Sequence, residues 1–310
     1  MNMEVNMNFM SQLKKRLLIA GSCGSWLLLL FLLSCQTTAR VPDAFRIDAS
    51  FAPLKSGAAA YIFADVKEAR KIIEIIPIRE LRDRNTRMML DRTNFVAAAV
   101  YPAESGQRFH LAAWGKYPNS RAGMALGANK NWRKINSPSG GFWHSQTDKL
   151  SIAISPRHAF AASSLSDEPL DPVISSQNVQ IPEGFNAFRS SNKGAPLSCW
   201  LGNPASSIDT ILSQTGLPFR APVQNVFINL FSLENDKYEA VIRFQFSGDS
   251  QARGLASILN LARGFASGTS NLITSIFLAN PPVQNGVNLD FKSAPLSERE
   301  LSLLFQIFLL

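Results

Sequence analysis

Short hydrophobic runs separated by polar turns predict a series of β-strands in the first half of the chain. Residues 57–65, 94–101 and 108–114 form the first three runs, and segment 102–106 has the composition of a hairpin loop. Between the first two strands, hydrophobic residues recur at spacings of three and four, which predicts a helix. These helix positions are Val66, Ala69, Ile72, Ile73 and Ile76. A second helix is expected from Ser120.

The second half of the chain repeats this order of elements. Residues 194–202 match the first strand, residues 204–214 match the helix, residues 225–231 and 238–244 match the hairpin, and a helix is expected from Ser250. A β-α-β-β-α order that occurs twice predicts two related lobes. The expected fold class is α+β, with a mostly antiparallel sheet packed against helices. Further strands are expected at residues 141–145, 150–154, 159–163, 272–278 and 287–291.

The same patterns divide the chain into segments. The stretch 164–193 is rich in Pro and Ser and lacks periodicity, which predicts a connector between two lobes. The first lobe then covers residues 46–163 and the second lobe residues 194–310. Two segments with another character precede them: an export signal over residues 1–34 and a tether over residues 35–45.

The amino-terminal segment has the layout of an export signal. A cationic cluster at residues 14–16 precedes the hydrophobic run 17–33, which a short Gly- and Ser-containing break interrupts. This run is shorter than the roughly 20 residues that a membrane-spanning helix needs. A signal peptide is therefore favoured, and an uncleaved anchor helix is the alternative.

Residues 32–35 read Leu-Leu-Ser-Cys, which resembles the lipobox of bacterial lipoproteins. The resemblance implies cleavage after Ser34, attachment of diacylglycerol to Cys35 and acylation of the new amino terminus, for example with palmitate. Gln36 follows the cysteine, which implies export to the outer membrane in the enterobacterial sorting pattern. Cys23 is a weaker candidate, because the hydrophobic segment 17–20 before it is shorter than a signal requires.

Composition and charge are those of a folded, basic, exported body. The chain has 310 residues, of which 46% are hydrophobic and 17% charged, and this excludes a disordered protein. Removing the predicted signal lowers the net charge from +8 by two, to +6. Because an exported protein does not meet cellular nucleic acid, the positive charge points to anionic lipid, an anionic glycan or solubility.

No constellation of residues predicts an enzyme. The three histidines, His110, His144 and His158, are scattered, and no spacing typical of a metal site occurs. The stretch 190–193 matches Ser-x-x-Lys, but residues 55–57, which resemble Lys-Thr-Gly, precede it, the reverse of the order in penicillin-recognising enzymes. We therefore expect no catalytic residues, no metal and no cofactor.

Two helices near the carboxyl terminus have hydrophobic faces. Residues 251–267 show a clear 3.6-residue period, and Ser297 to Glu300 reads as a capping box before the apolar segment 301–310. Ten residues are too few to cross a membrane, so each face covers the core or lies on a lipid surface. The core is favoured for both. The candidate membrane-contact residues are Leu255, Ile258, Leu259, Phe265, Leu304, Phe305 and Phe308.

Beyond the lipobox, the organisation of the body loosely resembles spirochaetal outer-membrane lipoproteins, whose mixed α/β bodies carry amphipathic helices that contact the inner leaflet. The resemblance implies a non-enzymatic envelope protein, anchored to membrane lipid through Cys35 and located at the outer membrane. It would act at a membrane surface or as an accessory to an envelope complex, with anionic lipid or an envelope protein as partner and no nucleic acid. The alternative is a lipoprotein that binds a small ligand in a cleft between the two repeated lobes.

Overall fold

The computed structural model describes residues 54, 56–77, 81, 84–103, 106–117, 119–136, 141–147, 149–154, 160–163, 181–191, 194–204, 222–265, 272 and 274–308. Ser34 and Cys35, with the predicted signal and tether, lie outside these residues. The chain divides into two compact units. Unit one takes in residues 78–179, and unit two takes in residues 58–77 and 180–310.

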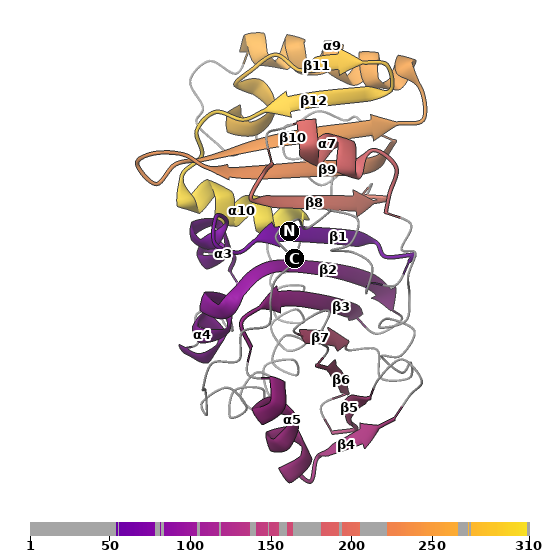
Figure 1. Ribbon diagram of the computed structural model, residues 1–310. Coiled ribbons are helices and arrows are strands. Elements are labelled where there is room, and N and C mark those ends of the chain that lie inside the picture. Colours follow the sequence, from indigo (N-terminus) through magenta and orange to yellow (C-terminus); the bar gives the residue numbers. More distant parts are fainter. Residues whose placement is uncertain are drawn as a thin grey trace, which may run out of the picture. The chain divides into compact units, whose positions relative to one another are not determined.

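Unit one is built on antiparallel strands in the order β2-β3-β7-β6-β5-β4 (Figure 1). The predicted hairpin is confirmed as β2 and β3, in which Ala103 pairs with Gly106. The strands are β2 (Thr93–Ala103), β3 (Gly106–Gly115), β4 (Trp132–Ile135), β5 (Phe142–Ser145), β6 (Leu150–Ala153) and β7 (Phe160–Ser163). Helix α4 (Arg84–Arg92) leads into β2, and α5 (Asn119–Ala128) lies between β3 and β4.

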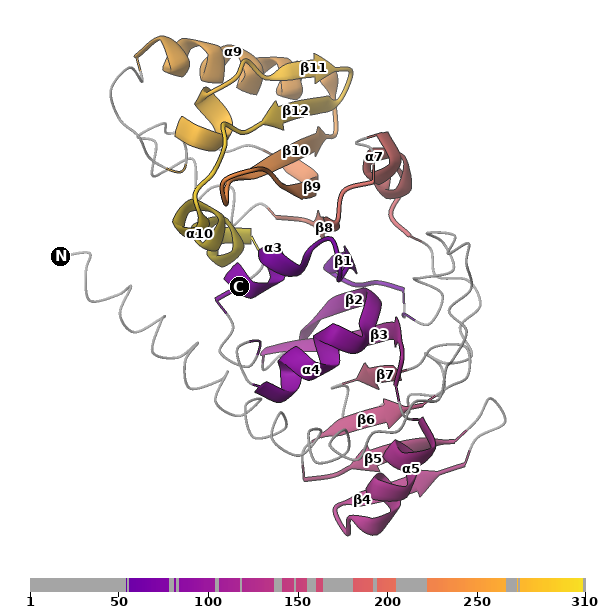
Figure 2. The same ribbon diagram turned by 60° about the vertical axis from the view of Figure 1, so that its left-hand side comes forward.

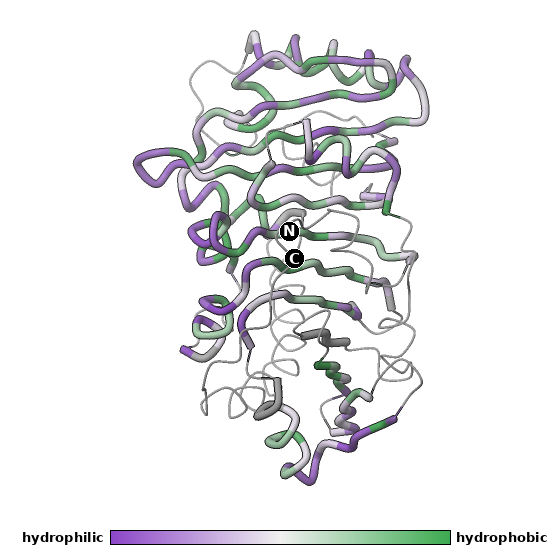
Figure 3. The backbone as a smooth tube through the Cα atoms, in the orientation of Figure 1, coloured by the Kyte–Doolittle hydropathy of each residue, from purple (hydrophilic) through white to green (hydrophobic). Residues whose placement is uncertain are grey.

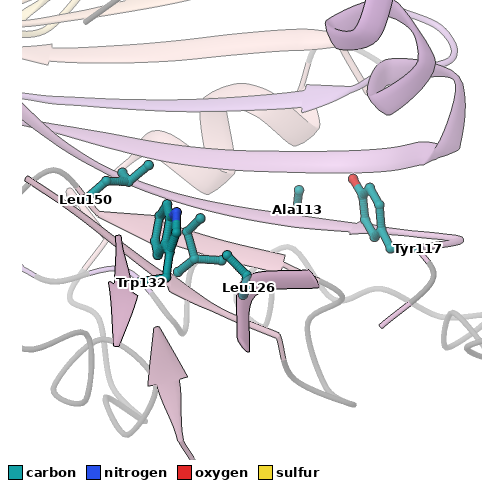
Figure 4. Close-up of a cluster of buried hydrophobic side chains, with 6 residues drawn as sticks. Ala113, Tyr117, Leu126, Trp132 and Leu150 are labelled. Atoms are coloured by element: carbon teal, nitrogen blue, oxygen red, sulfur yellow. The ribbon is translucent and has the colours of Figure 1, made fainter. Parts of the chain in front are cut away.

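A buried cluster joins these elements of unit one (Figure 4). Its members are Ala113, Tyr117, Leu126, Trp132, Leu150 and Ile152. The Tyr117 hydroxyl is hydrogen-bonded to Thr93 Oγ1, which also donates to the Met89 carbonyl at 2.7 Å. Burial raises the pKa of Tyr117 to about 12, against a smaller opposing effect of the bond to Thr93. This bonded chain ties the end of β3 to the end of α4.

Unit two has a second antiparallel set of strands, in the order β11-β12-β10-β9-β8-β1. The strands are β1 (Ala60–Asp65), β8 (Leu197–Gly202), β9 (Val223–Ser232), β10 (Tyr238–Phe246), β11 (Val283–Asn285) and β12 (Asn288–Lys292). The helices are α3 (Arg70–Ile75), α7 (Phe185–Ser191), α9 (Asp249–Phe265), the π-helical turn η2 (Thr274–Leu278) and α10 (Glu298–Phe308). The turn between β9 and β10 is hydrophilic (Figure 3).

The strands of unit two are covered on both faces. Along β10 buried and half-buried residues alternate, as expected when successive side chains point to opposite faces. On one face, the rings of Phe244, Phe277 and Phe291 lie 5.0–5.7 Å apart and join the sheet to η2. Helices α3 and α10 lie on this side, and α7 lies on the other (Figure 2).

The α+β class with antiparallel sheet is confirmed, whereas the duplication of the lobes is not. The first predicted strand, β1, pairs with the corresponding strand of the second half, β8, through register pairs such as Ala60 with Leu201. Residues 58–77 accordingly belong to unit two, although the sequence assigned them to the first lobe. The helix expected at residues 204–214 lies largely outside the described residues.

Two further expectations differ from the structure. The strand expected at 272–278 is wrong, because η2 occupies most of this segment and buries Ile276 and Phe277. A short apolar run fits a buried helix as well as a strand, so periodicity could not separate them. The predicted connector 164–193 contains helix α7, which buries Phe185 and Phe188.

Candidate functional site

Helix α9 turns its hydrophobic stripe toward the sheet. Leu255 and Leu259 are buried and Ile258 is half-buried, where the helix packs against η2, β10, β11 and β12. The polar residues Arg253 and Ser257 are exposed. The side chain of Phe265 lies outside the described part of the structure.

Helix α10 is likewise part of the core. Leu304 and Phe305 are buried, and Leu303 on the opposite side is 37% exposed. The predicted capping box is present: the Glu300 backbone N donates to Ser297 Oγ at 3.3 Å, and the Ser297 backbone N donates to Glu300 Oε2 at 2.8 Å. The side chain of Phe308 is not described.

Four of the seven candidate membrane-contact side chains are therefore core residues in this conformation. Leu255, Leu259, Leu304 and Phe305 cover apolar side chains that the unit-two strands would otherwise expose to water. In this conformation these four candidates do not form an exposed membrane-contact surface. In the part of the chain that the structure describes, no helix is long and apolar enough to cross a membrane.

His144 and the internal Cys199 lie within the folded part of the chain. His144 Nδ1 lies 2.9 Å from Ser151 Oγ, its cross-strand neighbour, and Ser151 is only 1% exposed. A hydroxyl buried in this way is out of reach of a substrate. Burial raises the pKa of the Cys199 thiol above its usual range, which removes thiolate reactivity. His158 lies outside the described residues, within which no group of three metal-ligating side chains occurs.

A polar cluster that the sequence did not predict lies under helix α7. Phe63 of β1 pairs with Ser198 of β8, and Ser198 pairs with Asn229 of β9. Residues paired directly across antiparallel strands point to the same face. That face is covered by α7, because Asn229 Nδ2 donates to the Phe188 carbonyl at 3.2 Å and the Arg189 guanidinium carbon lies 3.2 Å from the centre of the Phe63 ring.

We call Arg189, Ser198 and Asn229 the α7 polar cluster. Ser198 and Asn229 are fully buried and Arg189 is 8% exposed. Within the described residues, Arg189 Nε and Nη1, Ser198 Oγ and Asn229 Oδ1 have no hydrogen-bond partner. Burial lowers the pKa of Arg189 to about 10, partly offset by the charge of Asp65, so the guanidinium is positive at neutral pH. The cluster thus holds a buried cation that has no hydrogen-bonded carboxylate among the residues that the structure describes.

The sequence contains signals for this cluster. Arg189 stands at the four-residue spacing from Phe185 and directly after Phe188, which places it on the apolar stripe of α7. Ser198 and Asn229 are polar residues inside apolar strand runs. A polar residue at an inward-facing position requires a partner, and this requirement could have marked each of the three residues separately, although not the fact that they lie together.

The sequence matches the model of a known family, outer membrane-associated lipoprotein TP0453, over residues 47–270. The chain belongs to this family. Membership establishes an outer membrane-associated lipoprotein of the cell envelope, as the spirochaetal resemblance implied. The match takes in the α7 polar cluster and α9, and it ends before α10.

Solved structures of TP0453 share the fold. Crystal form III superposes with a TM-score of 0.56 at 17% sequence identity, covering 86% of this chain and 99% of that chain. Crystal form I gives a TM-score of 0.56 at 16% identity, covering 86% and 100%. Crystal form IV gives 0.55 at 17% identity, covering 83% and 96%. No curated protein matches the sequence.

Proposed function

We propose that acyl chains on Cys35 hold the protein to the envelope membrane, where it acts without enzymatic activity at the membrane surface or as an accessory to an envelope complex. The match to an outer membrane-associated lipoprotein family carries this proposal. The Leu-Leu-Ser-Cys motif supports Cys35 as the anchor, because it follows a cationic and then a hydrophobic segment in the order of an export signal.

The packing of unit two supports attachment by lipid. The apolar faces of α9 and α10 are used to cover the sheet, so in this conformation they are not available to a membrane. One acyl chain binds a membrane marginally, whereas several bind stably. Diacylglycerol together with an amino-terminal acyl chain would supply enough binding free energy without a contribution from the helices.

The absence of enzymatic activity is supported by the placement of the reactive side chains. Ser151 has a histidine neighbour but is buried, and Cys199 is buried with a raised pKa. Neither side chain has the exposure that a nucleophile needs to meet its substrate.

Labelling with radioactive palmitate tests the anchor. We expect the wild-type protein and Cys23→Ser to incorporate label, because Cys23 would be removed with the signal peptide. Cys35→Ser should incorporate none. Label retained in Cys35→Ser, or lost in Cys23→Ser, would contradict the assignment.

Vesicle sedimentation tests the action at a membrane surface. The body, residues 36–310, is checked for folding by circular dichroism and mixed with phosphatidylglycerol or phosphatidylcholine vesicles. With its positive charge it should sediment with the anionic vesicles and dissociate as salt rises. The proposal fails if the body binds neither vesicle and no envelope protein copurifies with the lipidated chain.

A further inference from the structure

We propose that the α7 polar cluster binds the carboxylate group of a small monocarboxylate. This inference does not rest on the lipid anchor, because all of its residues belong to the folded part of unit two.

The donors converge because of strand register. Phe63, Ser198 and Asn229 form one row across β1, β8 and β9 and face α7. Arg189 lies over the first member of the row, and the Phe188 carbonyl accepts a hydrogen bond from the last. Ser198, between them, therefore points its hydroxyl toward the underside of the same helix. Ser198 Oγ and the Arg189 nitrogens Nε and Nη1 lack hydrogen-bond partners among the described residues.

Arg243, on the same face of the sheet, shows how a comparable arginine is satisfied. Its guanidinium carbon lies 5.0 Å from the centre of the Phe188 ring, and it makes two hydrogen bonds to Asp290, of 2.6 and 2.7 Å. Arg189 has the ring contact but no such hydrogen-bonded carboxylate within the described chain. Asp65, whose charge acts on Arg189, accepts from the backbone N of Lys67 and Glu68.

A carboxylate supplies what is missing at Arg189. Water could satisfy the guanidinium N–H groups but would add no negative charge, so the cation would keep only the charge of Asp65, to which it makes no hydrogen bond within the described residues. A guanidinium binds carboxylate in a planar, charge-assisted arrangement, and a serine hydroxyl can donate to the same group. A single cation near the negative charge of Asp65 favours a monoanion over a dianion such as phosphate.

The surroundings favour a ligand with an apolar body. The rings of Phe185 and Phe188 pack on Phe227 at 6.5 and 5.6 Å, beside the cluster. Aromatic side chains next to a few placed polar groups are the usual composition of a small-molecule site. The ligand carboxylate would meet Arg189 and Ser198, and its apolar part would contact these rings. A free short-chain carboxylate and a fatty acid share this chemistry.

The test measures binding of [1-13C]butyrate to the full-length protein in detergent, from the shift of the carboxyl signal in 13C NMR. Butyramide and inorganic phosphate serve as ligand controls. We expect saturable binding of butyrate, and little of the two controls. Arg189→Met should weaken binding about 10- to 100-fold, and Ser198→Ala about fivefold. Arg243→Met, the matched arginine variant, should leave binding within about twofold, because Arg243 is paired to Asp290.

Native mass spectrometry of freshly purified protein distinguishes the sources. A copurifying long-chain carboxylate that Arg189→Met lacks identifies a fatty acid, whereas butyrate binding without such a molecule identifies a free short-chain acid. If Arg189→Met fails to fold, Ser198→Ala decides. The proposal is overturned if butyrate does not bind, if phosphate or butyramide binds equally well, or if Ser198→Ala or Arg243→Met departs from its expected effect.

Discussion

The capping box of α10 allows a quantitative test of what holds this helix on unit two. Ser297 Oγ donates to Glu300 Oε2 at 2.7 Å and accepts from the Glu300 backbone N at 3.3 Å, and Ser275 Oγ donates to Glu300 Oε1 at 2.7 Å. Ser297→Ala removes the first two of these bonds. We expect a loss of about 1–2 kcal/mol, since a serine cap contributes about 1 kcal/mol and bonds to a carboxylate are stronger than average.

Hydrogen-exchange mass spectrometry of peptides that cover residues 298–308 measures this loss. At neutral pH, exchange should be roughly 5- to 30-fold faster in Ser297→Ala. Ser257→Ala is the matched control, because Ser257 is exposed on α9 and bonds only the Arg253 carbonyl of its own helix. Exchange of 298–308 that is equal in the two variants would refute the reasoning.

The same box makes the stability of α10 depend on pH. Desolvation by itself would raise the pKa of Glu300, but the hydrogen bonds from Ser297 and Ser275 outweigh it and lower the pKa. A carboxyl group with a lowered pKa stabilises the fold above its unfolded pKa, about 4.3, and this contribution is lost as pH falls through the folded pKa. Glu300→Gln should abolish this part of the acid dependence.

Three further predictions, which use four substitutions, test other contacts. Leu304→Ala should destabilise unit two by about 2–5 kcal/mol in urea unfolding, because Leu304 is buried. Leu303→Ala, at an exposed site, should destabilise it by less than about 1 kcal/mol. Equal losses of stability would show that α10 is not packed as described. Tyr117→Phe should reduce the loss of stability between pH 10 and 12. A phenol with a raised pKa stabilises the fold below pH 10, and this stabilisation is lost as pH rises toward 12. An alkaline stability profile that is unchanged in the variant would contradict the burial of Tyr117. Gly115→Ala should lower the melting temperature of unit one, because a Cβ there would lie 1.9 Å from the Arg92 carbonyl oxygen. An unchanged melting temperature would show that the backbone at Gly115 can move away from Arg92.

Local patterns predicted the local parts of the fold. The run 225–231 and the run 238–244 became β9 and β10, joined by a tight turn, because a hairpin needs only alternation and turn residues. The serine and glutamate at 297 and 300 predicted the start of α10 for the same reason, since a capping box is complete within four residues.

Long-range partners could not be predicted in this way. Nothing near residues 57–65 indicates that β1 pairs with β8, because the pairing depends on residues far along the chain. The α7 polar cluster was missed for a similar reason. In the sequence, Arg189 is one basic residue in a polar connector. Its burial follows only from the position of α7 over Phe63 and Ser198.

The pairing of β1 with β8 has a consequence for export. Unit two is discontinuous in sequence, so the chain that crosses a membrane from its amino terminus delivers β1 long before its partner. Until Leu197–Gly202 arrives, the apolar strand Ala60–Asp65 has an unpaired edge, which is prone to aggregation. Residues 78–179 can collapse into unit one during this interval. If acyl chains on Cys35 tether the amino terminus, as we propose, they would keep the exposed strand of one molecule apart from those of its neighbours during this delay.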